Sequence, residues 1–591
     1  MVFAGLLAYR LVNARYVETF FQPDEYFQAL EPAWRSAFGP DSAAWITWEW
    51  KEGLRTSVHP LIFSLVYRMA DWLCEMFALR RSTRADVLVA APGVLQAIFA
   101  ATLDFFTWRT AARVYGTDHA AGSAALALTV ISPWQWFCSV RTFSNSLEAT
   151  LTAAAIHYFP WDWFLNNDGN VKEISMQPAR SLCGANEQHT STKVSAAELR
   201  PPVSLHVALI FAATAFYLRP TNVIIWAAIS AAILGSTFNY VKALTLASCA
   251  ALNGIAVVAA FALCDYHFYG EATFPPFRFL YLNLFQSLAI FYGKNRVDYY
   301  FTEGLPLLLT TALPFAAKGL WCGLASGRTN WQHSQTERWT RFISAFAVLF
   351  TVLVLSTIAH KEMRFIYPLL PLLHVLAAEP FASFFAPLPL PRTRVRQVLL
   401  TGLLASNIYI AAYVSTTHQR GVVDVVHYLR HRQEARFEAV SEDSDQSVHE
   451  IANITVGFLM PCHSTPWRSH FVYPEINAWA LTCEPPINMS PEQRASYLDE
   501  ADVFYNNPVD WMDLNMGERT TITLEESHKD ALEGNGKRPW PHYLVFFQHL
   551  EPTMKLVLSQ SNYRECRRFF NTHWIDDGRR NGDVVVWCVR R

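Results

Sequence analysis

Charged side chains are scarce in this sequence of 591 residues, at 17% against about a quarter in an ordinary soluble protein. The shortage is uneven, because residues 1–420 are 13% charged whereas residues 421–591 are 25% charged. A chain of soluble domains throughout is therefore excluded. We expect residues 1–420 to be embedded in a membrane and residues 421–591 to form a water-soluble domain.

A basic surface is also lacking. The formal net charge is −2, and no run of lysine and arginine exceeds three residues, so the electrostatic footprint of a nucleic-acid-binding protein is absent. Residues 421–591 contain neither a glycine-rich phosphate loop nor the cysteine and histidine spacing of a metal site. We expect no nucleic-acid partner, and pattern alone assigns the soluble segment no chemistry.

Long apolar runs are plentiful, and a membrane-spanning helix needs about 20 mainly apolar residues. The candidate spans are 2–16, 58–78, 87–107, 120–137, 140–163, 203–218, 221–239, 243–263, 305–323, 341–359, 365–385 and 397–415. If one of 120–137 and 140–163 is re-entrant or broken, about eleven transmembrane helices result. The fold class is therefore a polytopic α-helical membrane protein.

Short loops rich in lysine and arginine mark the cytosolic side of a membrane protein. The basic residues of three such loops are Arg80, Arg81 and Arg84; Lys318, Arg328, Arg338 and Arg341; and Arg392, Arg394 and Arg396. We expect them in the cytosol together with a polar, disordered loop at 165–202. The loop 18–57 and the soluble domain then share the other side.

The soluble segment alternates helical and strand patterns, which is typical of a small α/β layer. Helices are expected at 421–436, 491–500 and 551–570, and strands at 454–459, 503–505, 543–547 and 584–588.

Two features of this segment suit an oxidising compartment. The even set Cys462, Cys483, Cys566 and Cys588 favours disulfides, with four buried free thiols as the alternative. Asn453 begins an Asn-Ile-Thr acceptor for N-glycosylation. Both features agree with a position away from the cytosol.

Two adjacent acids follow the first span. Pro23 at a first helical position, with Asp24 and Glu25 in the first turn, predicts the start of a helix. We expect this helix to lie on the membrane surface with its carboxylates toward water, and Tyr26 beside them is a candidate substrate contact. Capping acids without a chemical role are the alternative.

Aromatic and polar residues gather at two further places. Trp48, Glu49 and Trp50 precede the second span, either as an aromatic belt at the membrane interface or as a platform for a sugar ring or a lipid. Arg141 and Asn145 belong to a charged, amide-rich break between apolar segments, and such a break normally lines a cavity. All five are candidate substrate-binding residues.

Three potential cations, His360, Lys361 and Arg364, lie within five positions between two apolar segments. In a helix, His360 and Arg364 would share one face, and such a group suits a phosphate leaving group. Snorkelling positive charge is the alternative, although that belongs on the cytosolic side. Arg219, in a turn on the same expected side, is a further substrate-binding candidate.

Carboxylates and cations on one face of a polytopic protein indicate chemistry on a lipid phosphate. Asp24 or Glu25 would deprotonate an acceptor hydroxyl while the cations at His360, Lys361 and Arg364 stabilise the departing phosphate. The same pattern also allows a transporter of an anionic substrate.

The residues named above carry a resemblance to a known family. Pro23-Asp24-Glu25, the segments 141–148 and 219–222, and His360-Lys-Glu-Met-Arg-Phe365 resemble the motifs of the dolichyl-phosphate-mannose-dependent mannosyltransferases, glycosyltransferase family 22. The resemblance spans most of the chain, and the His-Lys-Glu-x-Arg-Phe element is its most specific part. The segments 47–50, 458–466 and 503–508 resemble the members that add the third mannose of the GPI core.

The resemblance implies a GT-C fold in the endoplasmic reticulum membrane with a luminal active site. It implies inverting transfer of mannose from dolichyl phosphate mannose to the 2-hydroxyl of the second mannose of a GPI-anchor precursor, in an α-1,2 linkage. The family's acidic base maps best onto Asp24, with Glu25 second, and the donor phosphate onto the turn from His360 to Arg364. No metal or other cofactor is required, because fixed cations neutralise the phosphate, and a divalent ion held by Asp24 and Glu25 is the alternative.

Two other functions stay open at this point. A sister enzyme that assembles the lipid-linked N-glycan precursor would share the membrane motifs but not the tail segments, and a polytopic transporter would be expected to show inverted internal repeats. Members of the family usually carry a cytosolic segment before the first span, so the true N-terminus is left open.

Overall fold

The structure is a computed structural model that describes residues 1–165, 201–236, 239–285, 288, 291, 293–327, 335–442, 453–487, 489–517 and 537–589. The expected disordered loop at 165–202 and the basic residue Arg328 therefore lie outside the described residues, apart from the ends of that loop.

Residues 1–420 fold into helices, with 3₁₀ and π turns written η. The elements are α1 (Val2–Tyr16), η1 (Tyr26–Leu30), α2 (Glu31–Phe38), η2 (Pro40–Ser42), α3 (Trp48–Lys51), α4 (Val58–Met76), α5 (Arg81–Tyr115), α6 (Ala120–Ile131), α7 (Pro133–Cys138), α8 (Ser144–Tyr158), α9 (Trp161–Leu165), α10 (Val203–Leu218), η3 (Pro220–Asn222), α11 (Val223–Ser236), α12 (Tyr240–Tyr269), α13 (Pro275–Leu280), η4 (Tyr281–Phe285), η6 (Tyr300–Gly304), α14 (Leu305–Leu309), η7 (Thr310–Ala312), α15 (Leu313–Ser326), α16 (Gln335–Ser356), η8 (Met363–Leu369), α17 (Leu370–Phe384) and α18 (Arg394–Thr416).

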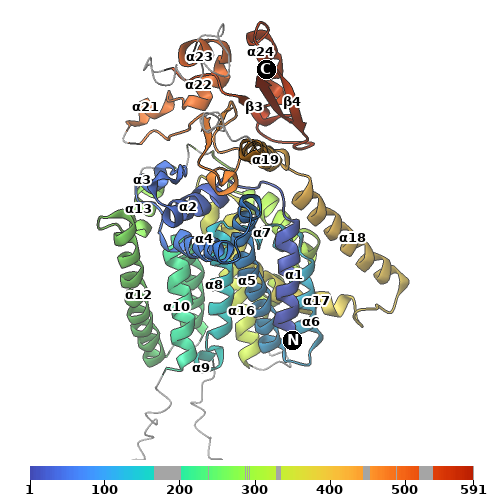
Figure 1. Ribbon diagram of the computed structural model, residues 1–591. Coiled ribbons are helices and arrows are strands. Elements are labelled where there is room, and N and C mark those ends of the chain that lie inside the picture. The colour runs from blue at the N-terminus through green and yellow to red at the C-terminus, as the bar shows by residue number, and fades with distance from the viewer. Residues whose placement is uncertain are drawn as a thin grey trace, which may run out of the picture.

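The long helices form a bundle, with the N-terminus at one end and the C-terminal domain at the other (Figure 1). Among the described residues, six helical segments are long and apolar enough to cross a membrane, namely 81–115, 240–269, 300–326, 335–356, 363–384 and 394–416. Helices suit this setting because they satisfy every backbone polar group internally. The segment 363–384 is central, with 89% of its most apolar window buried, whereas α18 is peripheral at 11%. The polytopic helical class is confirmed.

Helix α4 departs from the expected topology. It does not have the apolar character of the six long segments, and it lies with α2 across the end of the bundle that carries the C-terminal domain (Figure 1). We call this end the domain end. Polar residues such as Arg68 and Asp71 interrupt the apolar run of α4, which explains why it rests on the bundle instead of passing through it.

The prediction that the loop of Arg80, Arg81 and Arg84 is cytosolic, opposite the C-terminal domain, is wrong. Arg84 Nε donates to Asp71 Oδ1 at 2.5 Å, and the hydroxyl of Tyr473, in the C-terminal domain, donates to the Arg81 carbonyl at 3.0 Å. Arg81 and Arg84 are therefore held at the domain end by partners there. A count of charges along the sequence does not show such partners, because they come from other segments of the chain.

The other two basic loops lie at the opposite end, as expected. The Arg341 guanidinium pairs with Glu379 at 3.3 Å and covers the ring of Tyr115, the last residue of α5. Arg396 covers the ring of Phe384, the last residue of α17. Because α5 and α17 both begin at the domain end, their last residues mark the far end of the bundle.

The segment 120–137 is broken, which is one of the two expected forms. Helix α6 ends at Ile131, and α7 restarts at Pro133 with the Ser132 hydroxyl accepting from the Gln135 backbone N–H at 3.3 Å. A proline at a first helical position suits such a restart. The break carries Gln135 into the middle of the bundle.

The C-terminal domain is a small α/β layer, as expected. Its helical elements are α19 (Gly421–Glu442), α20 (Arg468–Phe471), α21 (Pro491–Ala495), α22 (Glu500–Asn506), α23 (Pro508–Asn515), η12 (Gln548–Leu550), α24 (Glu551–Val557) and η13 (Gly578–Arg580), and its strands are β1 (Ile454–Phe458), β2 (Ile476–Ala480), β3 (Tyr543–Phe547), β4 (Tyr563–Phe569) and β5 (Val584–Val589). The sheet order is β2-β1-β3-β5-β4, with β1 parallel to β2 and β3 and the other two pairs antiparallel.

Three details of this domain differ from the expectation. The segment 503–505 belongs to a helix rather than a strand, and the helix expected over 551–570 ends at Val557 and gives way to β4. Strand β2 was not expected.

The four cysteines of this domain form disulfides, as expected. Cys462 is bonded to Cys483 and Cys566 to Cys588, and the second disulfide links neighbouring strands.

The C-terminal domain packs on the loop 18–57. Glu31 Oε1 of α2 accepts from the Ser469 backbone N–H of α20 at 2.8 Å, and Trp45 meets Trp467 edge to face at 5.1 Å between ring centroids. Buried residues of both segments form one hydrophobic cluster. The loop is thus held between the bundle and the domain.

Two exposed positions test this topology. A single cysteine introduced as Thr83→Cys should react with a membrane-impermeant maleimide added from the side of the C-terminal domain, and Arg392→Cys should react only from the other side. Both positions are exposed, and the parent chain without an added cysteine is the control. Labelling of both from one side of sealed vesicles would contradict the placement of α4.

Candidate active site

Asp24 and Arg364 form an ion pair at the domain end of the bundle, although 340 positions separate them in the chain. Arg364 Nη1 donates to Asp24 Oδ2, while its Nε and Nη2 donate to the two oxygens of Glu362 at 2.7 and 2.9 Å. All three side chains are largely buried. Within the described part of the chain, Asp24 Oδ1 has no hydrogen-bond partner, so this oxygen can still accept a hydrogen bond.

Glu25 points elsewhere and is held by Arg141. Both of its oxygens accept from Arg141 Nη1, at 3.1 and 3.0 Å, and Oε1 also accepts from the Gln22 backbone N–H at 3.1 Å. Burial raises the pKa of Glu25, and the Arg141 charge opposes that rise. Since Arg141 also donates to the Phe137 carbonyl at 2.9 Å, the pair anchors the loop to α7.

The turn from His360 to Arg364 does not form one continuous helix. The expectation that His360 and Arg364 share one helical face is therefore wrong. Glu362 is extended, with φ −134° and ψ 149°, and η8 starts at Met363. His360 Nε2 lies 3.2 Å from Glu362 Oε1, so His360 and Arg364 meet through this carboxylate. Burial raises the pKa of Glu362, but Arg364 and His360 outweigh it and hold that pKa well below its usual range.

Lys361 is buried beside Asn295. Its backbone N–H donates to Asn295 Oδ1 at 3.0 Å, and its Nζ lies 3.4 Å from the Asn295 carbonyl oxygen. Among the described residues, no carboxylate pairs with this ammonium. Burial, with Lys294 adding to the effect, lowers the pKa of Lys361.

Arg219 is the second buried cation with little compensation. Its nearest carboxylate is Glu148, at 4.0 Å from Nε, and the oxygens of Glu148 already accept from Asn222 at 2.9 Å and Asn145 at 3.2 Å. Burial, reinforced by Arg55, lowers the pKa of Arg219 to about 10. An environment that disfavours a cation to this extent is one that an anionic ligand would relieve.

The tryptophans at 48 and 50 do not form an exposed platform. Both rings are buried, and Trp50 Nε1 donates to the Phe27 carbonyl at 3.0 Å. Glu49 accepts from Arg55 at 2.8 Å and from Gln28 at 3.0 Å. These side chains hold the loop 18–57 together.

Tyr26 likewise faces protein. It is buried and stacks on Phe20 at 5.4 Å between ring centroids, with His470 of the C-terminal domain edge-on at 5.3 Å.

The sequence pattern assigned no role to two polar residues of this region. Glu362 was passed over as a neighbour of cations, although it is the carboxylate that orients them. His59 of α4 is buried with Nε2 unpartnered among the described residues, and burial together with Arg219 lowers its pKa to about 3. The cost of a buried polar atom could have flagged His59, but only if α4 had been placed beside the site.

The acid pair does not fit a divalent ion, because Asp24 and Glu25 each face a different arginine instead of each other. Among the described residues, one group of close potential ligands stands out, namely Cys462, His463 and Cys483. Its two sulfurs are joined in a disulfide, whereas metal binding needs thiolates.

The pairing of Glu25 with Arg141 makes a prediction about stability. Glu25→Gln should destabilise the protein by about 3–5 kcal/mol, because it leaves a buried guanidinium without its counter-charge. Glu18→Gln is the matched control, since the ion pairs of Glu18 with Arg15 and Arg420 are partly exposed and worth about 0–1 kcal/mol. Thermal unfolding of both variants in detergent measures the difference, and equal losses would contradict an anchoring role.

Comparisons with known proteins show the family of this chain. The model of the Alg9-like mannosyltransferase family matches residues 1–472. A protein of Aspergillus fumigatus named GPI mannosyltransferase 3 is 44% identical over 613 residues, covering 100% of this chain and 77% of the relative. Proteins of the same name from Gibberella zeae and Yarrowia lipolytica are 38% and 36% identical, covering 98% and 99% of this chain and 94% and 96% of their own.

A solved structure shares the architecture. ArnT from Cupriavidus metallidurans, bound to undecaprenyl phosphate, aligns with a TM-score of 0.53 at 12% identity and covers 100% of this chain and 97% of its own. At this identity the likeness shows the fold alone, and it confirms the GT-C fold expected from the motifs. With the family match over residues 1–472, the chain belongs to the Alg9-like mannosyltransferase family.

Proposed function

We propose that this chain transfers the third mannose of the GPI anchor, from dolichyl phosphate mannose to the 2-hydroxyl of the second mannose of the precursor, in an α-1,2 linkage. The observation that carries the proposal is the open carboxylate oxygen of Asp24 within a group of buried cations. The names of the relatives aligned over the whole chain support this choice of substrate.

Asp24 is the proposed base. Its Oδ1 takes the proton of the acceptor hydroxyl while that oxygen forms a bond to the anomeric carbon of the donor mannose. The bond from that carbon to the phosphate oxygen breaks, and the electron pair leaves with dolichyl phosphate. Attack opposite the leaving group inverts the anomeric configuration.

Arg364 serves Asp24 more directly than it serves the phosphate. Glu362 holds the guanidinium through two hydrogen bonds in fork geometry. The guanidinium in turn donates one hydrogen bond to Oδ2 of Asp24 and so orients that carboxylate. Glu25, with both oxygens held by Arg141, is assigned a structural role.

Arg219 and Lys361 are the cations left to hold the donor phosphate. Both are buried, and neither has a closely paired carboxylate among the described residues. Positive charge fixed in advance stabilises the developing negative charge of a leaving group without reorganisation. This arrangement supplies the role that a metal ion plays in other transferases, and His360 supports it by orienting Glu362.

We place the protein in the endoplasmic reticulum membrane with the domain end in the lumen. Arg341, Arg392 and Arg396 lie toward the opposite end, which is typical of the cytosolic side. The two disulfides and the Asn453 acceptor belong to the domain end, and both modifications are made in the secretory pathway.

The role of Asp24 is tested in cells that lack the protein. Asp24→Asn should be expressed normally and should leave a GPI precursor with two mannoses, because the amide cannot accept the proton. Asp41→Asn, an exposed acid in the same loop, is the matched control and should restore the complete anchor. Full rescue by Asp24→Asn would remove Asp24 as the base, and an accumulating lipid-linked N-glycan instead of a GPI precursor would overturn the substrate.

The role of Arg219 is tested with the donor. Arg219→Met should raise the KM for dolichyl phosphate mannose about tenfold or more, because a charge-assisted contact to a phosphate contributes about 1.5–3 kcal/mol. Arg278→Met, at an exposed arginine of α13, should leave that KM unchanged. Initial rates at saturating acceptor measure both, and an unchanged donor KM in Arg219→Met would exclude Arg219 from the phosphate site.

A further inference from the structure

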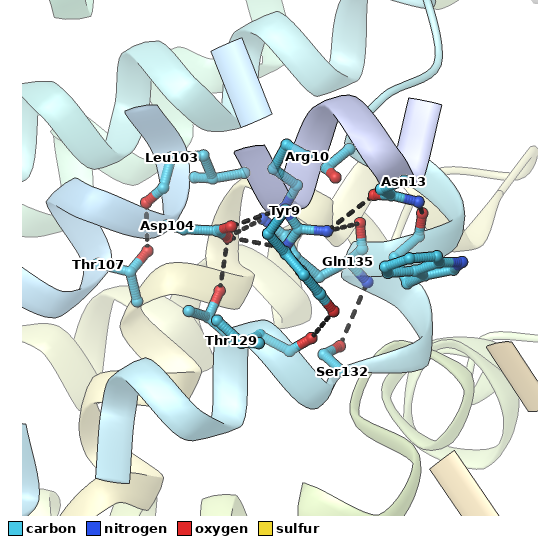
Figure 2. Close-up of polar contacts among 12 residues, drawn as sticks. Tyr9, Arg10, Asn13, Leu103, Asp104, Thr107, Thr129, Ser132 and Gln135 are labelled. Atoms are coloured by element: carbon cyan, nitrogen blue, oxygen red, sulfur yellow. Dashed lines mark hydrogen bonds and ion pairs between the residues drawn. The ribbon is translucent and has the colours of Figure 1, made fainter. Parts of the chain in front are cut away.

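An ion pair that takes no part in the site described above lies deep in the bundle (Figure 2). Arg10 of α1 and Asp104 of α5 are completely buried, and two hydrogen bonds join them, Nε to Oδ2 at 2.6 Å and Nη2 to Oδ1 at 3.0 Å. Ionisable side chains within a membrane are expensive and are functional candidates by default. The pair therefore needs a role beyond filling space.

Polar groups from three helices complete the pair. Asp104 Oδ1 also accepts from Thr129 of α6 at 3.1 Å and from Gln135 Nε2 of α7 at 3.0 Å. Arg10 Nη1 donates to Asn13 at 2.9 Å and reaches the Gln135 carbonyl at 3.3 Å. Gln135 is thus held twice, by its side chain and by its backbone, and Figure 2 shows it beside the pair.

Gln135 connects the ion pair to the element that carries Arg364. Its Oε1 accepts from the Tyr367 hydroxyl at 2.8 Å, so the amide has one orientation, with its nitrogen on Asp104 and its oxygen on Tyr367. Tyr367 is completely buried and belongs to η8. A buried amide satisfied at both ends is rigid, because any rotation leaves two polar groups unpaired.

Arg364 lies one turn before Tyr367 on the same short element. A 3₁₀ helix has three residues per turn, so residues i and i+3 are eclipsed. The two side chains therefore share one face of η8, with Arg364 at the Asp24 carboxylate and Tyr367 deeper in the bundle. The hydrogen bond of the Tyr367 hydroxyl therefore fixes how η8 is rotated about its axis, and with it the direction in which Arg364 points.

We propose that Gln135 and Tyr367 are positioning residues, which carry the fixed geometry of the Arg10–Asp104 pair to Arg364 and so hold Asp24 in its reactive orientation. The proposal rests on the proposed function only in the role given to Asp24. If the pair merely fastened helices together, its loss would lower stability and leave turnover intact. A positioning role predicts a loss of turnover beyond any loss of stability.

Two tyrosine variants separate these roles. Tyr367→Phe should lower kcat about tenfold or more, because small misplacements of a reacting group are costly, while the KM for the donor stays within about twofold. Tyr115→Phe is the matched control, since the Tyr115 hydroxyl joins α5 to the Val375 carbonyl of α17 at 3.1 Å, toward the opposite end of the bundle. An unchanged kcat in Tyr367→Phe, or an equal fall in both variants, would overturn the proposal.

A stability cycle on the full chain needs no substrate. The losses in thermal midpoint from Tyr367→Phe and Asp24→Asn should fail to add by about 1 °C or more, whereas those from Tyr115→Phe and Asp24→Asn should add. Additive losses in the first cycle would overturn the positioning role of Tyr367. If the wild-type protein transferred no mannose to the two-mannose acceptor, the proposed function would fail while this cycle still decided the inference.

Discussion

Buried arginines in the described part of the bundle are matched with carboxylates from distant segments, closely for Arg10 and Arg141 and only loosely for Arg219, and this matching organises the protein. An isolated charge in a low-dielectric interior is prohibitively costly. Arg10 meets Asp104 across α1 and α5, and Arg141 meets Glu25 across α7 and the loop 18–57. Each pair fixes the position of one segment relative to another, which apolar packing does not do by itself. The break in the segment 120–137 serves the same pairing, because it brings Gln135 into contact with Arg10 and Asp104.

The site arises where this matching is incomplete. Arg364 is shared by Asp24 and Glu362, which leaves one oxygen of Asp24 open, and Arg219 stands 4.0 Å from a carboxylate that is already engaged by two amides. Fixed, under-compensated positive charge is a preorganised site for a phosphate. The same end of the bundle therefore offers a base and a place for an anionic leaving group, which are the two requirements of transfer from a lipid phosphate.

Sequence patterns located the site but could not assign its pairs. The cost of charge at a membrane edge singled out Asp24, Arg141 and Arg364, and all three lie at the domain end. The choice between Asp24 and Glu25 depends on which arginine each carboxylate faces, and that contact spans more than a hundred positions. The loop of Arg80 to Arg84 departs from its expected side because Arg84 pairs with Asp71 of α4 and the Arg81 carbonyl accepts from Tyr473 of the C-terminal domain. The strand expected at 503–505 is part of α22, because three residues are too few for a hydrophobic period to distinguish a strand from a helix.

The central claim is that the open carboxylate of Asp24 drives inverting transfer of mannose onto a two-mannose GPI precursor. The most direct measurement incubates the purified protein with dolichyl phosphate mannose and that glycolipid, and then determines the linkage and anomeric configuration of the product by NMR. The account predicts one added mannose, α-linked to the 2-hydroxyl of the second mannose, with its configuration inverted from that of the donor. A product with retained configuration, or mannose added to a different hydroxyl, would contradict it.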